Sequence, residues 1–383
     1  MNLSKKFLAA STALLLAAAP LVAQKQPSPD VLTFNNGDQL SGKFVREIGG
    51  SVVFHSDMTG DQTVDLGKIK SLSSPVSFVA IKKTTGKQLE TVTGTVSVAD
   101  GKVTITPKAG AAVTLTAAEI AYLIDEPTYE LQIHRGVPFT KGWNGTLNAG
   151  FAMVRSTQTS TTFNGGLGLV RAVPSVPYLP ARNRTSLNVA ETYGKSTTPV
   201  IPPTTPASPD VTVKTNVFHA DAERDEYLAH KPVYALATAS FDHNFAQGLQ
   251  LQQIYGGGIG WTAIKQPKQT LDLKGDAHYE MQTFIPSNGV QAPDVHIFGS
   301  TFSEAYVRKL PKGMVFTETG NYIPGWTNTK VYSANVTAAL TLPVWKRWAA
   351  QIATTDNYLS NPAPYYKNNS YQFNVGLNYT FSH

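Results

Sequence analysis

The chain has 383 residues, a formal net charge of +6 and no cysteine. The absence of cysteine excludes a disulfide scaffold, a lipoprotein anchor and thiolate chemistry. Basic residues are spread along the chain without a dense Lys/Arg run, so nucleic acid is not an expected partner. Charged residues make up 15% of the chain, which is low for a water-soluble protein.

Residues 1–23 have the layout of a secretory signal peptide. Lys5 and Lys6 precede an apolar stretch that ends at Val22, and Ala23 is a suitable residue before the cleavage site. A cut after Ala19 is the alternative. No other apolar run is long enough to span a bilayer as a helix, so a membrane location would require a closed β-barrel.

Residues 24–127 contain an internal repeat, with copies at about 30–75 and 78–125. In each copy, a turn signal such as Asn36-Gly37 or Asp100-Gly101 separates alternating strands. This pattern predicts a duplicated small-β, SH3-like domain, whose two copies pack together because one alone has little core.

Neither copy carries a catalytic or metal-binding constellation. His55 and Asp57 are expected to be solvated, since no further ligand has suitable spacing. The domain is either a structural spacer or a periplasmic module that binds cell wall or a partner. Pro127 closes it, and residues 128–141 form a connector.

From residue 142 to 383 the chain alternates apolar and polar residues in about twelve segments, an even number as expected for a bacterial single-chain barrel. The last segment is the clearest, because polar residues such as Asn374 and Asn378 alternate with an apolar face. That face predicts a lipid-facing closing strand that also serves barrel assembly. Its residues are Tyr371, Phe373, Val375, Leu377, Tyr379 and Phe381. The whole pattern predicts an all-β fold, a transmembrane antiparallel up-and-down β-barrel; a soluble sandwich or propeller is the alternative.

The lengths of the predicted connections support this topology. Long connections at 195–211, 285–295 and 360–369 all fall on one side of the barrel, and most short ones fall on the other. Outer-membrane barrels have short periplasmic turns and longer outer loops. The connection at 173–183 is an exception, since it is long but falls on the periplasmic side.

Two segments of the barrel carry charged residues on the face that would line its interior. These lumen candidates are His219, Asp221, Glu223, Asp225, Asp272, Lys274, Asp276, His278 and Glu280. They form either an acidic zone that favours cations or a set of groups that pair and fill a narrow lumen. Arg224 has outward parity. Leu249 is expected to face outward with Tyr255, and Glu304 falls on the outward face of an ambiguous segment.

The chain resembles the salt-induced outer-membrane protein family, a bacterial barrel family of unknown function with a tandem small-β module. The resemblance rests on the tandem module, on Gly142-Trp143-Asn144-Gly145, and on Asn216 to Asp221 leading to Arg224-Asp225-Glu226-Tyr227. It implies an outer-membrane location and brings no catalytic residues. The chain departs from the usual barrel-assembly signal because it ends Phe381-Ser382-His383.

We therefore expect a non-enzymatic outer-membrane barrel with its N-terminal module in the periplasm, acting as a narrow channel or an envelope-stabilising protein. No cofactor or metal is expected. The expected partners are outer-membrane lipid, the barrel-assembly machinery and possible small solutes or ions. An adhesion barrel that uses outer loops 286–294 and 361–369 is the alternative. A lipid-acting enzyme is a third reading, in which outward-facing His243 lacks an evident partner.

Overall fold

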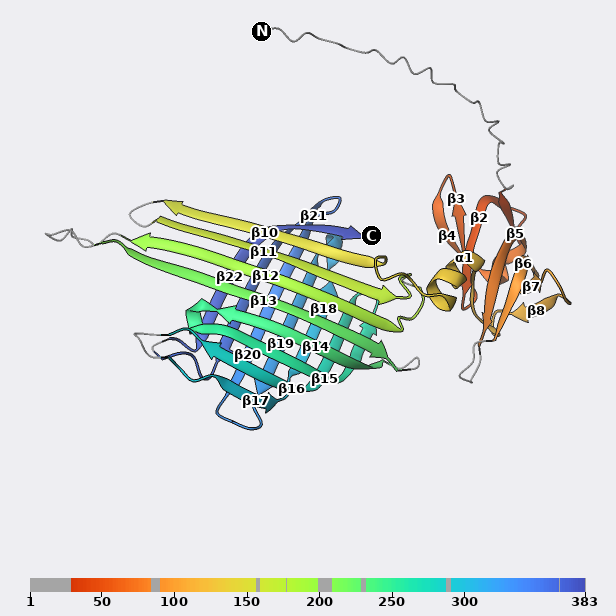
Figure 1. Cartoon of the computed structure of the whole chain (residues 1–383). Helices are drawn as coiled ribbons and strands as arrows, with labels where there is room; N and C mark the ends of the chain where they lie inside the picture. The colour runs from red at the N-terminus through yellow and green to blue at the C-terminus, as the bar shows by residue number, and fades with distance from the viewer. Residues whose placement is uncertain are drawn as a thin grey trace, which may run out of the picture. The chain divides into compact units, whose positions relative to one another are not determined.

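The computed structural model describes residues 29–83, 90–155, 159–176, 178–198, 209–228, 232–286, 291–364 and 366–382. The predicted signal peptide lies outside these residues. The chain divides into two compact units, Met1–Tyr129 and Glu130–His383 (Figure 1), and each is described by itself.

The first unit is a β-domain with one short 3-10 helix, η1 (Leu66–Lys68), and one helical turn, α1 (Glu126–Tyr129). Its strands are β1 (Asp30–Phe34), β2 (Gln39–Ile48), β3 (Ser51–Ser56), β4 (Gly60–Asp65), β5 (Ile69–Lys82), β6 (Thr91–Ala99), β7 (Lys102–Thr106), β8 (Val113–Thr116) and β9 (Ile120–Asp125). Within the described ranges, no helix is both long enough and apolar enough to cross a bilayer.

The two sequence copies fold as two five-stranded units that share β5. The first half of β5 pairs with β1, and its second half pairs with β9. A register shift between Ser74 and Ser77, on either side of Pro75, separates the halves. The two copies also pair with each other directly. The end of β2 in the first copy pairs with β9 of the second copy, and β6 of the second copy pairs along both halves of β5.

A single hydrophobic core joins the two copies. Leu32, Phe44 and Phe54 of the first copy share it with Val103 and Leu123 of the second. The two copies therefore pack together, as expected from the small core that one copy could form.

The second unit is a β-barrel (Figure 1). Its strands are β10 (Trp143–Arg155), β11 (Thr159–Val173), β12 (Asn183–Thr198), β13 (Val211–Tyr227), β14 (Val233–Asn244), β15 (Leu249–Gln266), β16 (Gln269–Phe284), β17 (Val295–Gly299), β18 (Phe302–Lys309), β19 (Val315–Pro324), β20 (Tyr332–Trp345), β21 (Trp348–Leu359) and β22 (Asn369–Ser382). Short helical turns, η2 (Glu130–His134), η3 (Phe245–Gln247) and η4 (Pro311–Gly313), lie outside the strands.

The ring of strands closes through antiparallel pairing. Apart from β17 and β18, consecutive strands pair with each other, and β22 returns to pair with β10. Strands β17 and β18 both pair with β16, so the 13 strands of the described chain occupy twelve positions around the ring. The predicted all-β fold with a closed antiparallel barrel of about twelve strands is confirmed.

The outer face of the barrel wall is apolar and exposed. Exposed large side chains with outward parity occur on nearly every strand; they include Leu147, Phe151, Phe163, Val189, Tyr255, Ile259, Trp261, Phe298, Phe302, Tyr322, Val336, Ile352, Tyr371, Phe373, Val375 and Leu377. An apolar band of this extent around a sheet is what a hydrocarbon layer would cover, since water-soluble monomers rarely expose large apolar patches.

The two ends of the barrel differ. We call the end where β10 begins the proximal end and the opposite end the distal end. Proximal connections such as 267–268 and 346–347 are tight, whereas 199–210, 285–294 and 360–368 at the distal end are long.

The long proximal connection between β11 and β12 holds the connector that precedes the barrel. The Gln132 side chain donates a hydrogen bond to the Ser175 hydroxyl (2.9 Å), and Arg182 donates to the Gln132 carbonyl oxygen (3.1 Å). Arg171 donates to the carbonyl oxygens of Val137 (2.6 Å) and Lys141 (2.9 Å). Ser175 and Arg182 of this connection, together with Arg171 of β11, thus bind the connector through its backbone carbonyl groups and the Gln132 side chain.

One predicted orientation is wrong. Leu249 is buried, whereas Gln250 is exposed. The cause is an irregularity at the start of β15, where the pairing with β16 shifts between Leu249 and Leu251. Such a bulge reverses the parity of the residues before it.

Candidate functional site in the barrel lumen

The nine lumen candidates lie on β13 and β16, and their contacts show which face they occupy. The Lys274 ammonium on β16 lies 2.6 Å from the Glu223 carboxylate on β13, although two strands separate β13 from β16. Side chains of strands that are not neighbours can meet in this way only across the interior of the barrel. The alternate residues of both strands therefore face the lumen.

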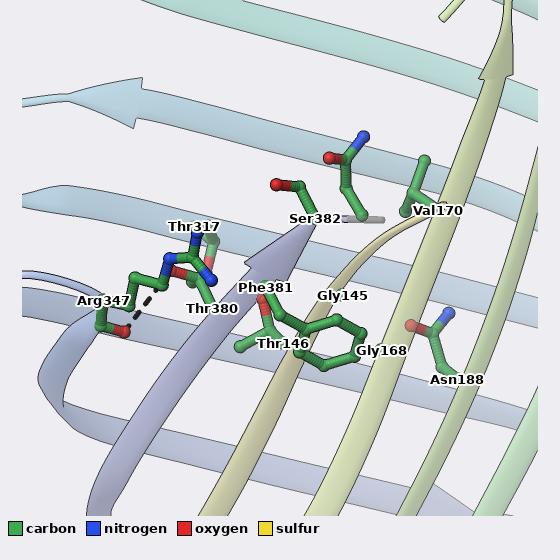
Figure 2. Close-up of a pocket in the computed structure, with 11 residues that line it drawn as sticks. Gly145, Thr146, Gly168, Val170, Asn188, Thr317, Arg347, Thr380, Phe381 and Ser382 are labelled. Atoms are coloured by element: carbon green, nitrogen blue, oxygen red, sulfur yellow. Dashed lines mark hydrogen bonds between the residues drawn. The ribbon is translucent and has the colours of Figure 1, made fainter. Parts of the chain in front are cut away.

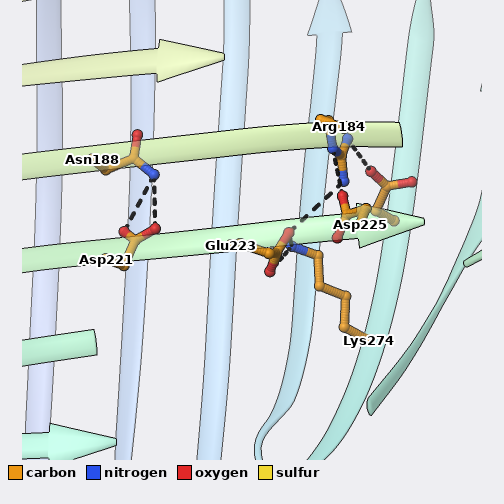
Figure 3. A network of polar contacts seen from close by, with 7 residues as sticks. Arg184, Asn188, Asp221, Glu223, Asp225 and Lys274 are labelled. Carbon is orange, nitrogen blue, oxygen red and sulfur yellow. Dashed lines mark hydrogen bonds and ion pairs between the residues drawn. The ribbon is translucent and has the colours of Figure 1, made fainter. Parts of the chain in front are cut away.

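The largest charge cluster gathers around Arg184 on β12 (Figure 3). Its guanidinium lies 2.7 Å from Asp225, 3.2 Å from Asp272 and 3.9 Å from Glu223. The Asp225 side chain is only 1% exposed, so its charge depends on the guanidinium beside it. Arg184 and Lys274 thus pair with three carboxylates of the predicted acidic zone, Glu223, Asp225 and Asp272.

Sequence reasoning missed Arg184, although its parity with Ser186 and Asn188 could have revealed it. Its guanidinium also lies over the Tyr234 ring, 5.6 Å from the centroid. Tyr234 in turn needs Gly260, because a Cβ at that position would lie 2.2 Å from the ring. This contact explains one glycine of the Gly-rich stretch in β15 as close packing inside the wall.

His219 and Asp221 form a second, more exposed cluster. His219 lies 2.6 Å from Asp242 on β14 and 3.0 Å from Asp221, and both contacts are between a ring nitrogen and a carboxylate oxygen. The Asn188 amide donates to both oxygens of Asp221, at 3.0 and 3.2 Å (Figure 3). The imidazole is thus held between two carboxylates.

Asp276, His278 and Glu280 form a third cluster, which is buried. The His278 ring lies 2.9 Å from Asp276 and 3.8 Å from Glu280. Asp276 also accepts a hydrogen bond from the backbone N–H of Thr301 (2.7 Å). These contacts fix the groups within the wall on the β16 side of the lumen.

The distal end of the lumen is packed on this same side. Glu280 accepts hydrogen bonds from the amides of Gln252 and Gln282, and Gln282 accepts one from Asn361 of the last long connection (2.8 Å). Above them, an apolar cluster buries Leu249, Phe284, Leu359 and Ala363. The connection at 360–368 therefore folds inward across part of the distal mouth.

The opposite wall, formed by β10, β11, β12 and β22, borders a cavity of about 720 Å³ near the proximal end (Figure 2). Most of the residues that line it are Asn, Ser, Thr or Gly; the full set is Asn144, Gly145, Thr146, Gly168, Val170, Asn188, Thr317, Arg347, Thr380, Phe381 and Ser382. Arg347 is the one charged residue among them. Its carbonyl oxygen accepts a hydrogen bond from the backbone N–H of Thr380 (2.9 Å).

The predicted assembly strand is β22. Tyr371, Phe373, Val375 and Leu377 are exposed on the outer face. Tyr379 packs against Trp348, with ring centroids 5.0 Å apart. Phe381 lies over Gly145, where an added Cβ would come within 2.2 Å of its ring.

Charged side chains also occur on the outer wall. Glu304 on β18 pairs in register with Gly320 and has outward parity, and Glu318 on β19 lies two residues away. Arg224 faces outward as predicted and contacts the exposed Glu226 at 2.6 Å. His243 faces outward, and its Nδ1 lies 2.7 Å from the carbonyl oxygen of Gln250.

Among the described residues, no group of His, Asp or Glu side chains has a metal-binding arrangement.

Residues 147–381, most of the barrel, match the family described as "Protein of unknown function, DUF481". The chain belongs to this family. No curated protein matches the chain.

Several solved outer-membrane structures are similar to the barrel. The COG4313 outer membrane channel from Pseudomonas putida F1 shares 11% identity at a TM-score of 0.37, covering 62% of this chain and 95% of that one. The translocator domain of the autotransporter NalP from Neisseria meningitidis shares 11% identity at a TM-score of 0.32, covering 62% and 87%. The transport unit of the autotransporter AIDA-I from Escherichia coli shares 10% identity at a TM-score of 0.31, covering 67% and 96%. The fold of this chain is established by its own strand pairing.

Proposed function

We propose that the chain is a non-enzymatic barrel of the bacterial outer membrane and acts as a restricted channel for small, uncharged polar solutes. The exposed apolar residues of the outer wall support the membrane location, because hydrocarbon is the solvent that such a wall suits. Cleavage of residues 1–23, a periplasmic location of the N-terminal module, assembly by the barrel-assembly machinery and kinship with the salt-induced outer-membrane family belong to the same proposal.

The observation that carries the channel proposal is the division of the lumen into two walls. On the β13–β16 wall, acidic side chains are paired with Arg184, Lys274 or a histidine. On the β10–β12 and β22 wall, the cavity is lined mainly by amides, hydroxyls and glycines. A path of that lining suits uncharged hydroxylated solutes better than a stream of cations, because no ring of free carboxylates is available to concentrate cations.

The test uses the mature full chain refolded into lipid vesicles. Heat-modifiable migration on a gel reports a folded barrel, and liposome swelling with sugars of increasing size reports passage of neutral solutes. We expect swelling with small sugars that stops above a size limit, and planar-bilayer currents with little preference between cations and anions. A folded barrel that passes neither sugars nor ions would refute the channel and leave the envelope-stabilising reading.

The adhesion reading receives less support. Part of the loop on which it depends folds inward, where Asn361 and Ala363 contact Gln282 and Gln247. The proposed absence of enzymatic activity is tested separately, by measuring hydrolysis of phospholipid in detergent micelles; release of fatty acid would contradict it.

A further inference from the structure

The seam between the first and last barrel strands is closed over only part of its length. The ladder between β10 and β22 runs from the pair Asn144–Ser382 to the pair Ala149–Leu377. The same register would continue through Gly150–Gly376 and end at Arg155–Tyr371. All of these residues lie within β10 and β22, yet none of these later pairs forms among the residues that the structure describes.

Each strand keeps its other neighbour along this open stretch. Strand β10 stays paired with β11 as far as Arg155–Thr159, and β22 stays paired with β21 as far as Asn369–Tyr358. The seam between β15 and β16 is, by contrast, paired from Gln266–Gln269 to Leu249–Phe284. The gap is thus a local opening of the wall in its distal half, with two intact edges.

Both edges of the gap carry exposed apolar residues outside, and the β22 edge is polar inside. Phe151 on β10 and Phe373 and Val375 on β22 are exposed on the outer face. Gln372 and Asn374 alternate with them and have inward parity. At the inner corner of the gap, a Cβ on Gly150 would lie 2.5 Å from the Val375 carbonyl oxygen, and one on Gly376 would lie 2.7 Å from that of Ala149, so the two strands are still in contact where the pairing ends.

An open edge in hydrocarbon is costly unless a partner satisfies its backbone N–H and C=O groups. An acyl chain cannot do so, whereas water or a hydroxylated head group can. The cavity described above lies on the same β10–β22 wall, next to the paired half of the seam. The gap therefore lies between the membrane and the lumen, distal to this cavity on the same wall.

We propose that the seam is a lateral passage through which an amphipathic, lipid-class molecule moves between the lumen and the membrane. The uncharged polar head group would travel along the β10–β22 wall, and the alkyl tail would lie outside against Phe151, Phe373 and Val375. This inference rests on the proposed channel, because it uses the same lumen.

The test bridges the seam chemically. The chain has no native cysteine, so a Phe151→Cys/Val375→Cys pair can be joined by a short bismaleimide in the refolded full chain. The matched control is Leu147→Cys/Tyr379→Cys, which lies at an existing pair of the same parity in the closed half of the seam. Octyl glucoside with a photoreactive group on its sugar is the probe, and mass spectrometry maps the labelled residues.

We expect the sugar group to label lumen positions such as Asn164 and Gln372 in the unbridged protein. Bridging the seam should abolish this labelling, while bridging the control should leave it unchanged. Equal labelling of the two bridged proteins would overturn the lateral passage. A Val375→Cys variant that links two copies by a disulfide would overturn it in a different way, by assigning the edge to a second chain.

Liposome swelling separates this inference from the channel itself. If small sugars still pass when the seam is bridged and the labelling is lost, both proposals are supported. If the unbridged protein passes no sugar, the channel fails; lumen labelling that depends on the open seam would then support the lateral passage alone.

Discussion

The charge cluster around Arg184 gives the most direct test of how the lumen is built. We consider Arg184→Ala, which removes the guanidinium that lies 2.7 Å from Asp225 and 3.2 Å from Asp272. The substitution leaves the Asp225 carboxylate buried without its cation. It does not disturb the outer wall, because Arg184 has inward parity.

The expected cost follows from burial. Removing one partner of a buried ion pair destabilises a protein by about 3–5 kcal/mol, since the remaining charge is left without compensation. The Arg184 side chain is 25% exposed, and Lys274 remains nearby, so we take the lower end, about 3 kcal/mol. At an m-value of about 2–3 kcal/mol/M this lowers the urea midpoint by about 1 M or more.

The measurement is reversible urea unfolding in vesicles, followed by tryptophan fluorescence and gel mobility. Arg224→Ala is the matched control, because Arg224 lies on the next strand, faces outward and pairs with the exposed Glu226. Its loss should cost less than about 1 kcal/mol. Combining Arg184→Ala with Asp225→Asn should recover part of the stability, because the carboxylate charge is removed as well.

The same variant also probes ion selectivity. Without Arg184, the carboxylates of Glu223, Asp225 and Asp272 face the lumen with Lys274 as their nearest remaining cation, so the currents should shift toward cations. If Arg184→Ala costs no more than Arg224→Ala and leaves selectivity unchanged, the cluster is solvated by a wide water-filled lumen, and the reasoning from paired charges is wrong.

Three further outcomes are expected. Burial raises the pKa of the Glu47 carboxyl in the first unit, so folding favours its protonated form; protection of β2 amides from hydrogen exchange in the full chain should be greatest at low pH and fall as pH rises through the raised pKa. Glu47→Gln should remove this dependence, and an unchanged pH profile would contradict the assignment. Glu304→Leu should stabilise the barrel in vesicles by about 1 kcal/mol, because a carboxylate on a lipid-facing wall is unfavourable; equal or lower stability by urea unfolding would indicate that protein covers this face. Gly145→Val should displace Phe381, whose ring lies 2.2 Å from the position of a Cβ there, and slow barrel assembly, measured as the rate at which the heat-modifiable form appears; an unchanged rate would show that this contact does not contribute to closure.

Strand parity allowed much of the barrel to be predicted from the sequence. In β22, residues from Tyr371 to Phe381 alternate so regularly that their faces follow from local geometry alone. The same rule gives the inward parity of Glu223 and Lys274. Parity fails at Leu249, because a bulge is a property of the pairing with β16 and leaves no mark in the local pattern.

Other features depend on which residues meet across the barrel. No local pattern indicates that Arg184 would reach Asp272 on a strand four positions away. This ion pair could therefore not be predicted from the sequence. The inward fold of the loop at 360–368 depends in the same way on Gln282 and Gln247. The gap between β10 and β22 also depends on pairing across the barrel, since β22 alternates regularly along its whole length, including the half that is left unpaired.

The first unit does not divide cleanly into its two copies, because both copies use strand β5. Because the end of β2 pairs with β9, and β6 pairs with the first half of β5, each copy completes its edge with a strand from the other. A polypeptide that carried only one copy would expose that edge, and a second molecule of the same kind could supply the missing strand. A single copy should therefore behave as an obligate homodimer. The tandem repeat would provide the same pairing within one chain.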